Sequence, residues 1–186
     1  MRQRLAAAPA VPEAGCAVPC THVSSAAVVT AIQVRSLPVA QTRALRRSVL
    51  RPHQSIEEMR ETEPQGAHAV GVIDGDELIA TGLIAPDPAR GYGLWRVRGM
   101  ATKPRARGRG AGTAVLDALL EHARAQGASR VWCNVRTNAC SLYERAGFKT
   151  VSEEFELPGI GPHVVMELAF SSTAHTAAHG SVSLST

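Results

Sequence analysis

Apolar residues recur in two different periods along the chain, and the period changes several times between residues 32 and 170. A short apolar run at 32–35 is followed by a helical pattern over 38–50, which Pro52 ends. Two further apolar runs, 70–73 and 78–84, flank an Asp-Gly pair, which is the signal of a β-hairpin. The first half therefore predicts a strand, a helix and two antiparallel strands.

A further strand is predicted over 94–102, with a glycine in its interior. A glycine inside a strand, here Gly99, indicates a bulge or a close approach of the backbone to another group. Strict alternation assigns the residues to two faces: Trp95, Val97 and Gly99 on one, and Leu94, Arg96, Arg98 and Met100 on the other.

The second half contains the clearest helical pattern of the chain. Apolar residues recur there at spacings of three and four, and Gly127 stands where a C-terminal cap belongs. Strands and helices alternate in both halves, so the fold class is predicted as mixed α/β. The elements expected in this half are a helix over 112–126, a strand over 131–135, a short helix over 139–146 and strands over 149–157 and 164–170.

Length and composition allow one domain with a complete core, because the chain has 186 residues of which 45% are apolar. Residues 1–28 and 171–186 are rich in small and polar residues without a period, so both are predicted to be disordered tails. The domain is expected to span 29–170. No apolar run approaches the ~18 residues of a membrane-spanning helix, and a cytoplasmic protein without a membrane partner is expected.

The formal net charge is +4, and its densest part is a group of three arginines, Arg105, Arg107 and Arg109. Only 4% of residues are aromatic, and none interleaves with these arginines, which argues against a nucleic-acid partner. The spacings of the four cysteines match neither a zinc site nor a disulfide framework, so free thiols and no metal are expected.

The three arginines flank a glycine-rich turn that joins a strand to the clearest helix. The first N–H groups of a helix lack partners and favour anions, and glycines let a phosphate approach the backbone. Two known phosphate loops do not fit: no Gly-Lys pair occurs, and Thr113 stands where a dinucleotide fingerprint has its third small residue. The turn is therefore predicted to bind a pyrophosphate.

Arg107, Gly110 and Gly112 match the Q/R-x-x-G-x-G/A motif, and the chain resembles the GNAT superfamily of acyl-CoA N-acyltransferases over residues 32–170. Residues 100–104 and 143–148 extend the resemblance on both sides of the turn. It implies a twisted, mostly antiparallel sheet that splays open between two neighbouring parallel strands and holds acetyl-CoA in the gap. The cofactor-binding residues that it implies are Met100, Ala101, Thr102, Arg107, Gly108, Arg109, Gly110, Ala111, Gly112 and Thr113.

The resemblance also implies that Tyr143 is the general acid that protonates the leaving thiolate, although local packing against Phe148 is the alternative. Many relatives carry a glutamate base on the strand before the turn, and this strand has none. The candidates for the general base are therefore His163, Glu154 and a chain of waters. We choose His163, because imidazole suits proton uptake near neutral pH; a structural role in the turn after Pro162 is its alternative.

The family pattern often has an asparagine seven residues before the tyrosine, whereas this chain has Arg136 there and Asn138 out of register. The function that the resemblance implies is direct transfer of an acetyl group from acetyl-CoA to a primary amine. A sensor that binds acyl-CoA without turnover is the alternative. The acceptor pocket is expected from 52–67 and 85–93, and a homodimer is possible because relatives often dimerise.

Overall fold

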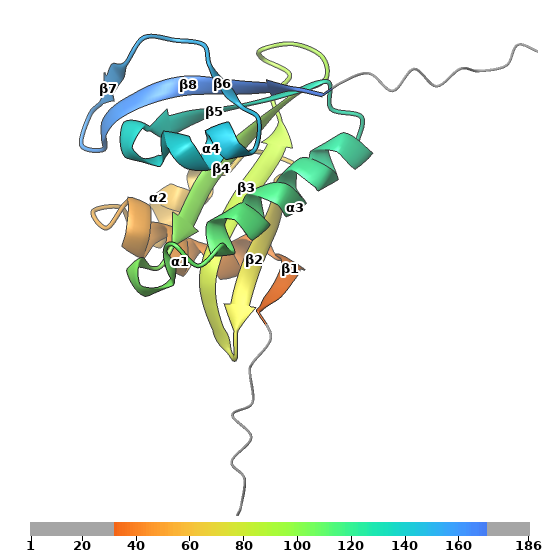
Figure 1. Cartoon of the computed structure of the whole chain (residues 1–186). Helices are drawn as coiled ribbons and strands as arrows, with labels where there is room; N and C mark the ends of the chain where they lie inside the picture. The colour runs from red at the N-terminus through yellow and green to blue at the C-terminus, as the bar shows by residue number, and fades with distance from the viewer. Residues whose placement is uncertain (1–31, 171–186) are drawn as a thin grey trace, which may run out of the picture.

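One sheet of eight strands runs through residues 32–170, the part of the chain that the computed structural model describes. The predicted tails, 1–28 and 171–186, lie outside the described residues. The strand order is β1-β2-β3-β4-β5-β8-β6, with β7 paired to β8, and among these pairs only β4 and β5 run parallel (Figure 1). The strands are β1 (Gln33–Leu37), β2 (His68–Asp74), β3 (Glu77–Pro86), β4 (Leu94–Thr102), β5 (Arg130–Arg136), β6 (Lys149–Thr150), β7 (Phe155–Leu157) and β8 (Gly161–Ala169).

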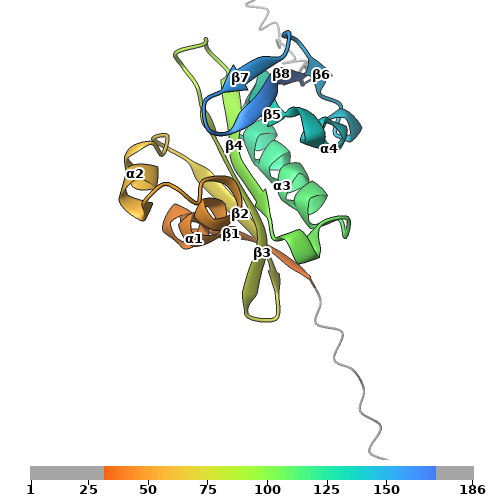
Figure 2. The same ribbon diagram turned by 90° about the vertical axis from the view of Figure 1, so that its left-hand side faces the viewer.

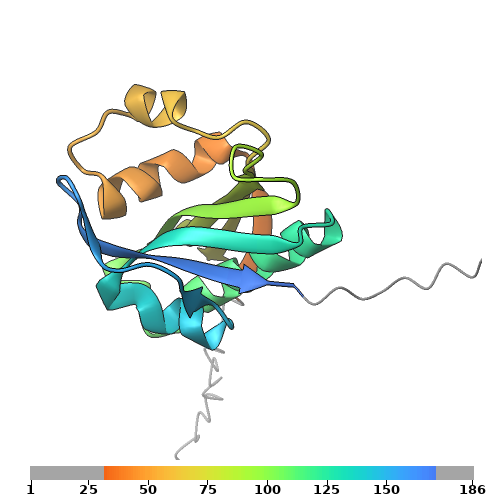
Figure 3. The ribbon, with the colours of Figure 1, turned by 90° about the horizontal axis from the view of Figure 1, so that it is seen from above.

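Helices cover both faces of this sheet. Figure 2 shows α1 and α2 on one face and α3 and α4 on the other, and the view from above gives the same two layers (Figure 3). The helices are α1 (Val39–Leu50), α2 (Ile56–Glu61), α3 (Ala111–Ala125) and α4 (Cys140–Arg145), with short 3-10 turns at Pro104–Ala106 and Thr137–Ala139. The predicted mixed α/β class and its mostly antiparallel sheet are therefore confirmed.

The main core lies between the sheet and α3. The helix turns its apolar residues inward at the predicted spacings, so that Val115, Leu116, Leu119 and Ala123 have no exposed surface. Burying a leucine or valine side chain contributes about 1.5–3 kcal/mol. Strand residues from both halves of the sheet complete this core, among them Val70, Ile84, Val97, Val131 and Met166.

The helix predicted over 112–126 and the hairpin between β2 and β3 are both confirmed, the latter with Gly75 at φ 62° in its turn.

Helix α2 was not predicted. Its signal in the sequence is a capping box, Ser55 three residues before Glu58. In the structure Ser55 Oγ accepts a hydrogen bond from the Glu58 N–H, and the Glu58 carboxylate accepts one from the Ser55 N–H.

The single strand predicted over 149–157 is wrong, because the chain forms two short strands there, β6 and β7. The ladder with β8 is interrupted between them. The N–H of Val165 donates at 2.8 Å to Ser152 Oγ. A side-chain acceptor thus replaces a backbone carbonyl, and regular pairing stops at this point.

The bulge expected at Gly99 is confirmed. Leu83 lies opposite Arg98 and Thr81 opposite Ala101, so that Gly99 and Met100 together face Gly82. The extra residue reverses the alternation predicted for this strand. Met100 turns toward α3, where a Cβ on Gly82 would meet its sulfur, whereas Gly99 faces α1. The predicted assignment of Gly99 and Met100 to faces is therefore wrong, because the bulge shifts the alternation by one residue.

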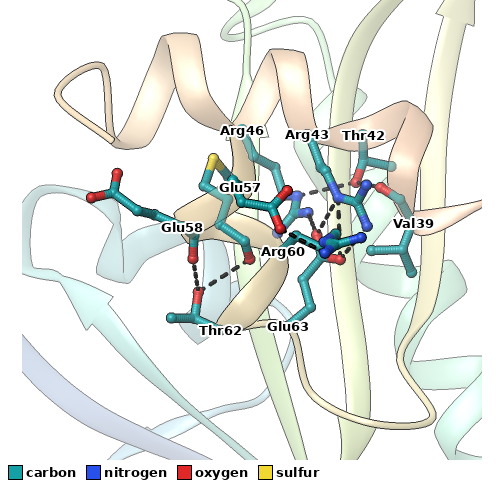
Figure 4. Close-up of polar contacts among 10 residues, drawn as sticks. Val39, Thr42, Arg43, Arg46, Glu57, Glu58, Arg60, Thr62 and Glu63 are labelled. Carbon is teal, nitrogen blue, oxygen red and sulfur yellow. Dashed lines mark hydrogen bonds and ion pairs between the residues drawn. The ribbon is translucent and has the colours of Figure 1, made fainter. Parts of the chain in front are cut away.

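An ion-pair cluster stands behind this bulge, on the α1 side of the sheet (Figure 4). Arg43 and Arg46 both donate to Glu63, Arg43 Nη2 at 2.7 Å, and Arg46 Nε also donates to Thr42 Oγ1 at 3.0 Å. A Cβ on Gly99 would lie 2.8 Å from Cδ of Arg46. Glycine is therefore required at the bulge, both by its φ of 61° and by the arginine packed on it.

Burial alone would raise the pKa of the Glu63 carboxyl, but hydrogen bonds from Arg43 and Arg46 outweigh it and lower the pKa below its ordinary value. A carboxylate with a lowered pKa stabilises the folded state fully above the pKa of the unfolded chain. That contribution is lost as the pH falls through the pKa of the folded state. Glu63 therefore makes the fold, and with it the bulge, sensitive to acid.

We expect Glu63→Gln to lower the free energy of unfolding at pH 7 by about 2 kcal/mol, because two arginines lose a hydrogen-bonded charge. Urea unfolding between pH 7 and pH 3 measures this difference. It should shrink below pH 4.5, the ordinary glutamate pKa, as Glu63 of the wild type becomes protonated. The control is Glu57→Gln, which removes an exposed pair with Arg60 and should cost less than about 1 kcal/mol. A difference that stays constant down to pH 3 would contradict the linkage.

Candidate active site

Strands β4 and β5 pair over only three residues and then diverge. Leu94–Arg96 lie beside Arg130–Trp132 in parallel register, and beyond this point the two strands share no ladder. A cavity of about 470 Å³ lies between the diverging parts, lined on β4 by Arg96–Met100 and Thr102 and on β5 by Asn134–Arg136. The predicted opening between two neighbouring parallel strands is thus confirmed.

The free edge of β4 presents two residues to this gap. The N–H of Lys103 donates to the carbonyl of Ile79 at 2.8 Å, and in an antiparallel ladder every second residue bonds the same neighbour. Ala101 therefore directs its backbone groups to β3, while those of Met100 and Thr102 point to the open edge. Met100 and Thr102 line the cavity, and Ala101 is buried outside it.

The glycine-rich turn ends where α3 begins, beside the same gap. Gly110 is the N-cap of α3 at φ 82°, and no side chain caps the helix. The N–H groups of Ala111, Gly112 and Thr113 thus keep the free donors of a helix terminus. Gly108 also has a positive φ, and a Cβ on it or on Gly110 would meet no atom within 4 Å. The turn therefore leaves space for a group that binds these donors.

Of the three arginines around the turn, only Arg107 lines the cavity. Its Nε donates to the carbonyl of Thr102 at 3.4 Å, which orients the side chain along the gap. Arg105 instead forms an ion pair with Glu77, as Lys103 does, and Arg109 is exposed away from the lining residues. The pair with Glu77 balances part of the positive charge that the sequence concentrates here.

Tyr143, on α4, is buried and lines the cavity. Its ring packs edge-on against Phe148, with centroids 5.5 Å apart. Tyr143 therefore makes the predicted packing contact and also lines the cavity. Burial raises the pKa of its hydroxyl above the ordinary value. The hydroxyl therefore keeps its proton throughout the neutral and moderately alkaline range and has that proton to donate.

His163, on β8, lies opposite Arg136 of β5 and lines the cavity although it is 5% exposed. Its Nδ1 is 2.7 Å from the carbonyl oxygen of Gly161. Since a carbonyl only accepts, Nδ1 carries the proton and the neutral ring has its lone pair on Nε2. Glu154, the other candidate base, is exposed and does not line the cavity.

Several lining residues were not predicted. Alternation along β5 puts Val131, Cys133 and Val135 in the core, so Asn134 between them must face the other way. A polar residue inside an apolar strand is the sequence signal that could have identified Asn134 as a lining residue. Asn138 lines the cavity, and Arg136 does so while donating to the carbonyl of Leu50 at 3.3 Å. Neither 52–67 nor 85–93 lines this cavity, and the remaining wall consists of Val49, Leu50, Arg51, Ala139, Leu142, Leu157 and Ile160. The first of these segments instead lines a smaller cavity of about 150 Å³ through Gln54, Met59, Thr62, Glu63 and Pro64, and that cavity shares Leu50, Arg51, Arg98 and Gly99 with the larger one.

Neither Cys133 nor Cys140 is placed to act as a nucleophile. Burial raises the pKa of both thiols, and for Cys140 the nearby Glu144 raises it further. Both groups therefore stay protonated, and a protonated thiol is a weak nucleophile. Within residues 32–170, no three metal-binding side chains are grouped, and no helix is long and apolar enough to cross a membrane.

A sheet that opens between two parallel strands, with a free helix N-terminus at the opening, defines the class of acyl-CoA-dependent acyltransferases. Residues 32–148 match the model of the acetyltransferase (GNAT) family. The chain is 33% identical over 140 residues to the uncharacterized N-acetyltransferase YitI of Bacillus subtilis (strain 168), covering 73% of this chain and 94% of that protein. The chain belongs to the GNAT family and is an acyltransferase.

Solved structures have the same fold. The ribosomal-protein-S18-alanine N-acetyltransferase of Escherichia coli superposes with a TM-score of 0.64 at 16% identity, over 78% of this chain and 98% of that one. A Bacillus subtilis acetyltransferase in complex with CoA superposes with a TM-score of 0.58 at 15% identity, over 76% of this chain and all of that one. At such identities the likeness concerns the fold alone.

We expect Arg107→Ala and Gly110→Asp each to weaken acetyl-CoA binding about tenfold or more, which corresponds to about 1.4 kcal/mol. The first removes a charge at the opening, and the second puts a negative charge at the helix N-terminus, where it opposes a phosphate. Calorimetric titration measures both. Arg145→Ala, on exposed α4 surface outside the cavity lining, is the matched control and should bind as the wild type does. Equal affinity in all four proteins would remove the turn from the binding site.

Proposed function

We propose that the chain transfers the acetyl group of acetyl-CoA to a primary amine, directly and within a complex of both substrates. One observation carries the proposal: Arg107, Tyr143 and His163 line one cavity, in the gap between β4 and β5. Acetyl-CoA supplies the activated acetyl thioester. A single cavity that holds both a donor and an acceptor of protons suits transfer without a covalent enzyme intermediate.

The binding half of the proposal assigns the pyrophosphate to the turn. The N–H groups from Gly108 to Thr113 and the Arg107 guanidinium are the donors, with Arg109 as an outer charge. The open edge of β4 offers the backbone groups of Met100 and Thr102 to an extended chain, as an additional strand would be bound. Ala101 supports this edge through its pairing with β3.

The catalytic half divides three tasks among the residues at the cavity. The bulge breaks the ladder at Gly99 and Met100, and an N–H there stabilises the negative charge that develops on the thioester oxygen. His163 Nε2 takes the proton that the nitrogen loses as its bond to the acetyl carbon forms. The Tyr143 hydroxyl gives its proton to the sulfur as the carbon–sulfur bond breaks.

A sensor that binds acyl-CoA without turnover is the second candidate. It is favoured by one observation: among residues 32–170, no aspartate or glutamate lines the cavity, so the usual carboxylate base is missing. The extent of the domain, 29–170, the cytoplasmic location and a homodimer stay predictions from the sequence.

We expect Tyr143→Phe to lower kcat by about 10- to 100-fold, within the range for loss of a general acid, and to leave acetyl-CoA affinity unchanged. Release of free thiol across a broad panel of amines measures the rate. Because the pKa of this hydroxyl is raised above its ordinary value of 10.0, the wild-type hydroxyl carries its proton at both pH 7 and pH 9. The loss of activity in Tyr143→Phe should therefore be the same at these two pH values. Binding by both proteins with turnover by neither would identify the sensor.

We expect His163→Gln to lower kcat at least tenfold while KM for acetyl-CoA changes little. Glutamine can keep a hydrogen bond to the Gly161 carbonyl but offers no basic nitrogen to the cavity. Steady-state kinetics separate the two parameters. His122→Gln, on α3 and outside the cavity lining, is the matched histidine control. A normal kcat in His163→Gln would reduce this residue to its structural role.

A further inference from the structure

Arginines dominate the charge of the cavity on its α1 side. Arg51, Arg96, Arg98 and Arg136 all line it, together with His163, and no carboxylate among residues 32–170 does so. Arg96 and Arg98 extend from β4 on the face opposite the buried Trp95 and Val97. They lie directly before the Gly99 bulge, on the side of the gap away from the glycine-rich turn.

These four arginines lack carboxylate partners. The carboxylates that form ion pairs in the described part of the chain, Glu57, Glu63, Glu77 and Glu167, contact other cations. Arg98 and Arg136 donate only to backbone carbonyls, at 3.5 and 3.3 Å. Asp87, whose charge favours protonated Arg96, accepts a hydrogen bond from Trp132 Nε1 at 3.0 Å instead.

Arg96 carries the sharpest sign of a missing partner. Its Nε is buried and has no hydrogen-bond partner, the one such side-chain atom among residues 32–170. Its guanidinium lies 4.2 Å from the centroid of the Trp132 ring, which holds it in place. A buried donor without an acceptor destabilises the fold, and an anion that enters the cavity and accepts from it removes this cost.

Burial and neighbouring arginines disfavour the charged form of both Arg96 and Arg98. Burial lowers the pKa of the Arg96 guanidinium, and nearby Arg98 lowers it further. Burial likewise lowers the pKa of Arg98, followed by the charges of Arg51 and Arg46. A bound anion counteracts the repulsion between these cations, because it forms charge-assisted hydrogen bonds with the guanidinium groups.

We infer that the acceptor is an amine that carries a carboxylate a few bonds from its nitrogen, and that Arg96 and Arg98 bind this carboxylate. The inference rests on the proposed function. A planar carboxylate matches the fork of the Arg96 guanidinium, which lies over the Trp132 ring. Because Arg98 adjoins the bulge, a carboxylate bound there leaves the nitrogen of a small amino acid near the thioester.

The wall beyond the arginines is apolar. Val49, Leu50, Leu157 and Ile160 line the cavity from the end of α1 and from the turn between β7 and β8. An uncharged side chain of the acceptor would contact these residues while its carboxylate meets the arginines. The acceptor class is therefore an amino acid with an apolar side chain.

The first test compares acceptors that differ only in the anion: leucine with isoamylamine, phenylalanine with phenethylamine, and phosphoethanolamine with ethanolamine. Thiol release from acetyl-CoA gives kcat/KM for each. We expect the amino acids to exceed their matched amines at least tenfold. Equal or faster turnover of the amines that lack an anion overturns the inference and leaves the proposed function intact. A preference for phosphoethanolamine alone overturns the carboxylate in favour of a phosphate.

The second test needs no turnover and follows binding of N-acetyl-leucine and N-acetyl-phenylalanine to the protein saturated with CoA. Arg98→Gln should weaken binding at least tenfold, Arg98→Lys less, and both should still bind CoA, which shows that they are folded. Arg60→Gln, an exposed arginine of α2, is the control and should change nothing. Arg98-dependent binding without turnover of any amine supports the carboxylate site and refutes the transferase proposal. No binding in the wild type overturns the inference.

Discussion

The interrupted pairing between β4 and β5 is the constraint on which the rest of this structure depends. Two parallel strands that pair over three residues and then separate leave a free backbone edge inside the molecule. Unpaired backbone groups in a protein interior are costly unless a partner replaces the missing strand. The gap therefore leaves an open backbone edge that can pair with an extended group.

The bulge at Gly99 couples this edge to the opposite face of the sheet. The extra residue turns Met100 toward the α3 side and leaves Gly99 against Arg46. Arg46 is held by Glu63, which follows α2, so the second layer of the fold supports the backbone at the centre of the site. The family architecture explains the gap, while the chain's own arginines and His163 supply polar side chains to its lining.

The charges of the site divide between its two sides. The α3 side has a helix N-terminus without a side-chain cap and the guanidinium of Arg107. On the α1 side, half-buried arginines lie without counterions, and Arg96 keeps a buried donor unpaired. Proteins retain such unsatisfied groups where a ligand completes them. A substrate pair with anions at both ends fits this distribution better than a neutral amine does.

Much of this was determined by the sequence alone, because its information is local. Periodicity predicted the helices at 38–50 and 112–126, a glycine within a strand predicted the bulge, and the turn from 107 to 112 identified the family motif. Three features were decided by the tertiary structure. Pairing with β8 divided 149–157 into two strands. The bulge exchanged the faces of Gly99 and Met100. The fold also brought Arg96, Arg98 and Asn134 to the cavity that His163 lines. These features depend on the register between strands distant in the sequence. A glycine can indicate a bulge locally, but the partner strand decides which residues the bulge moves to the other face.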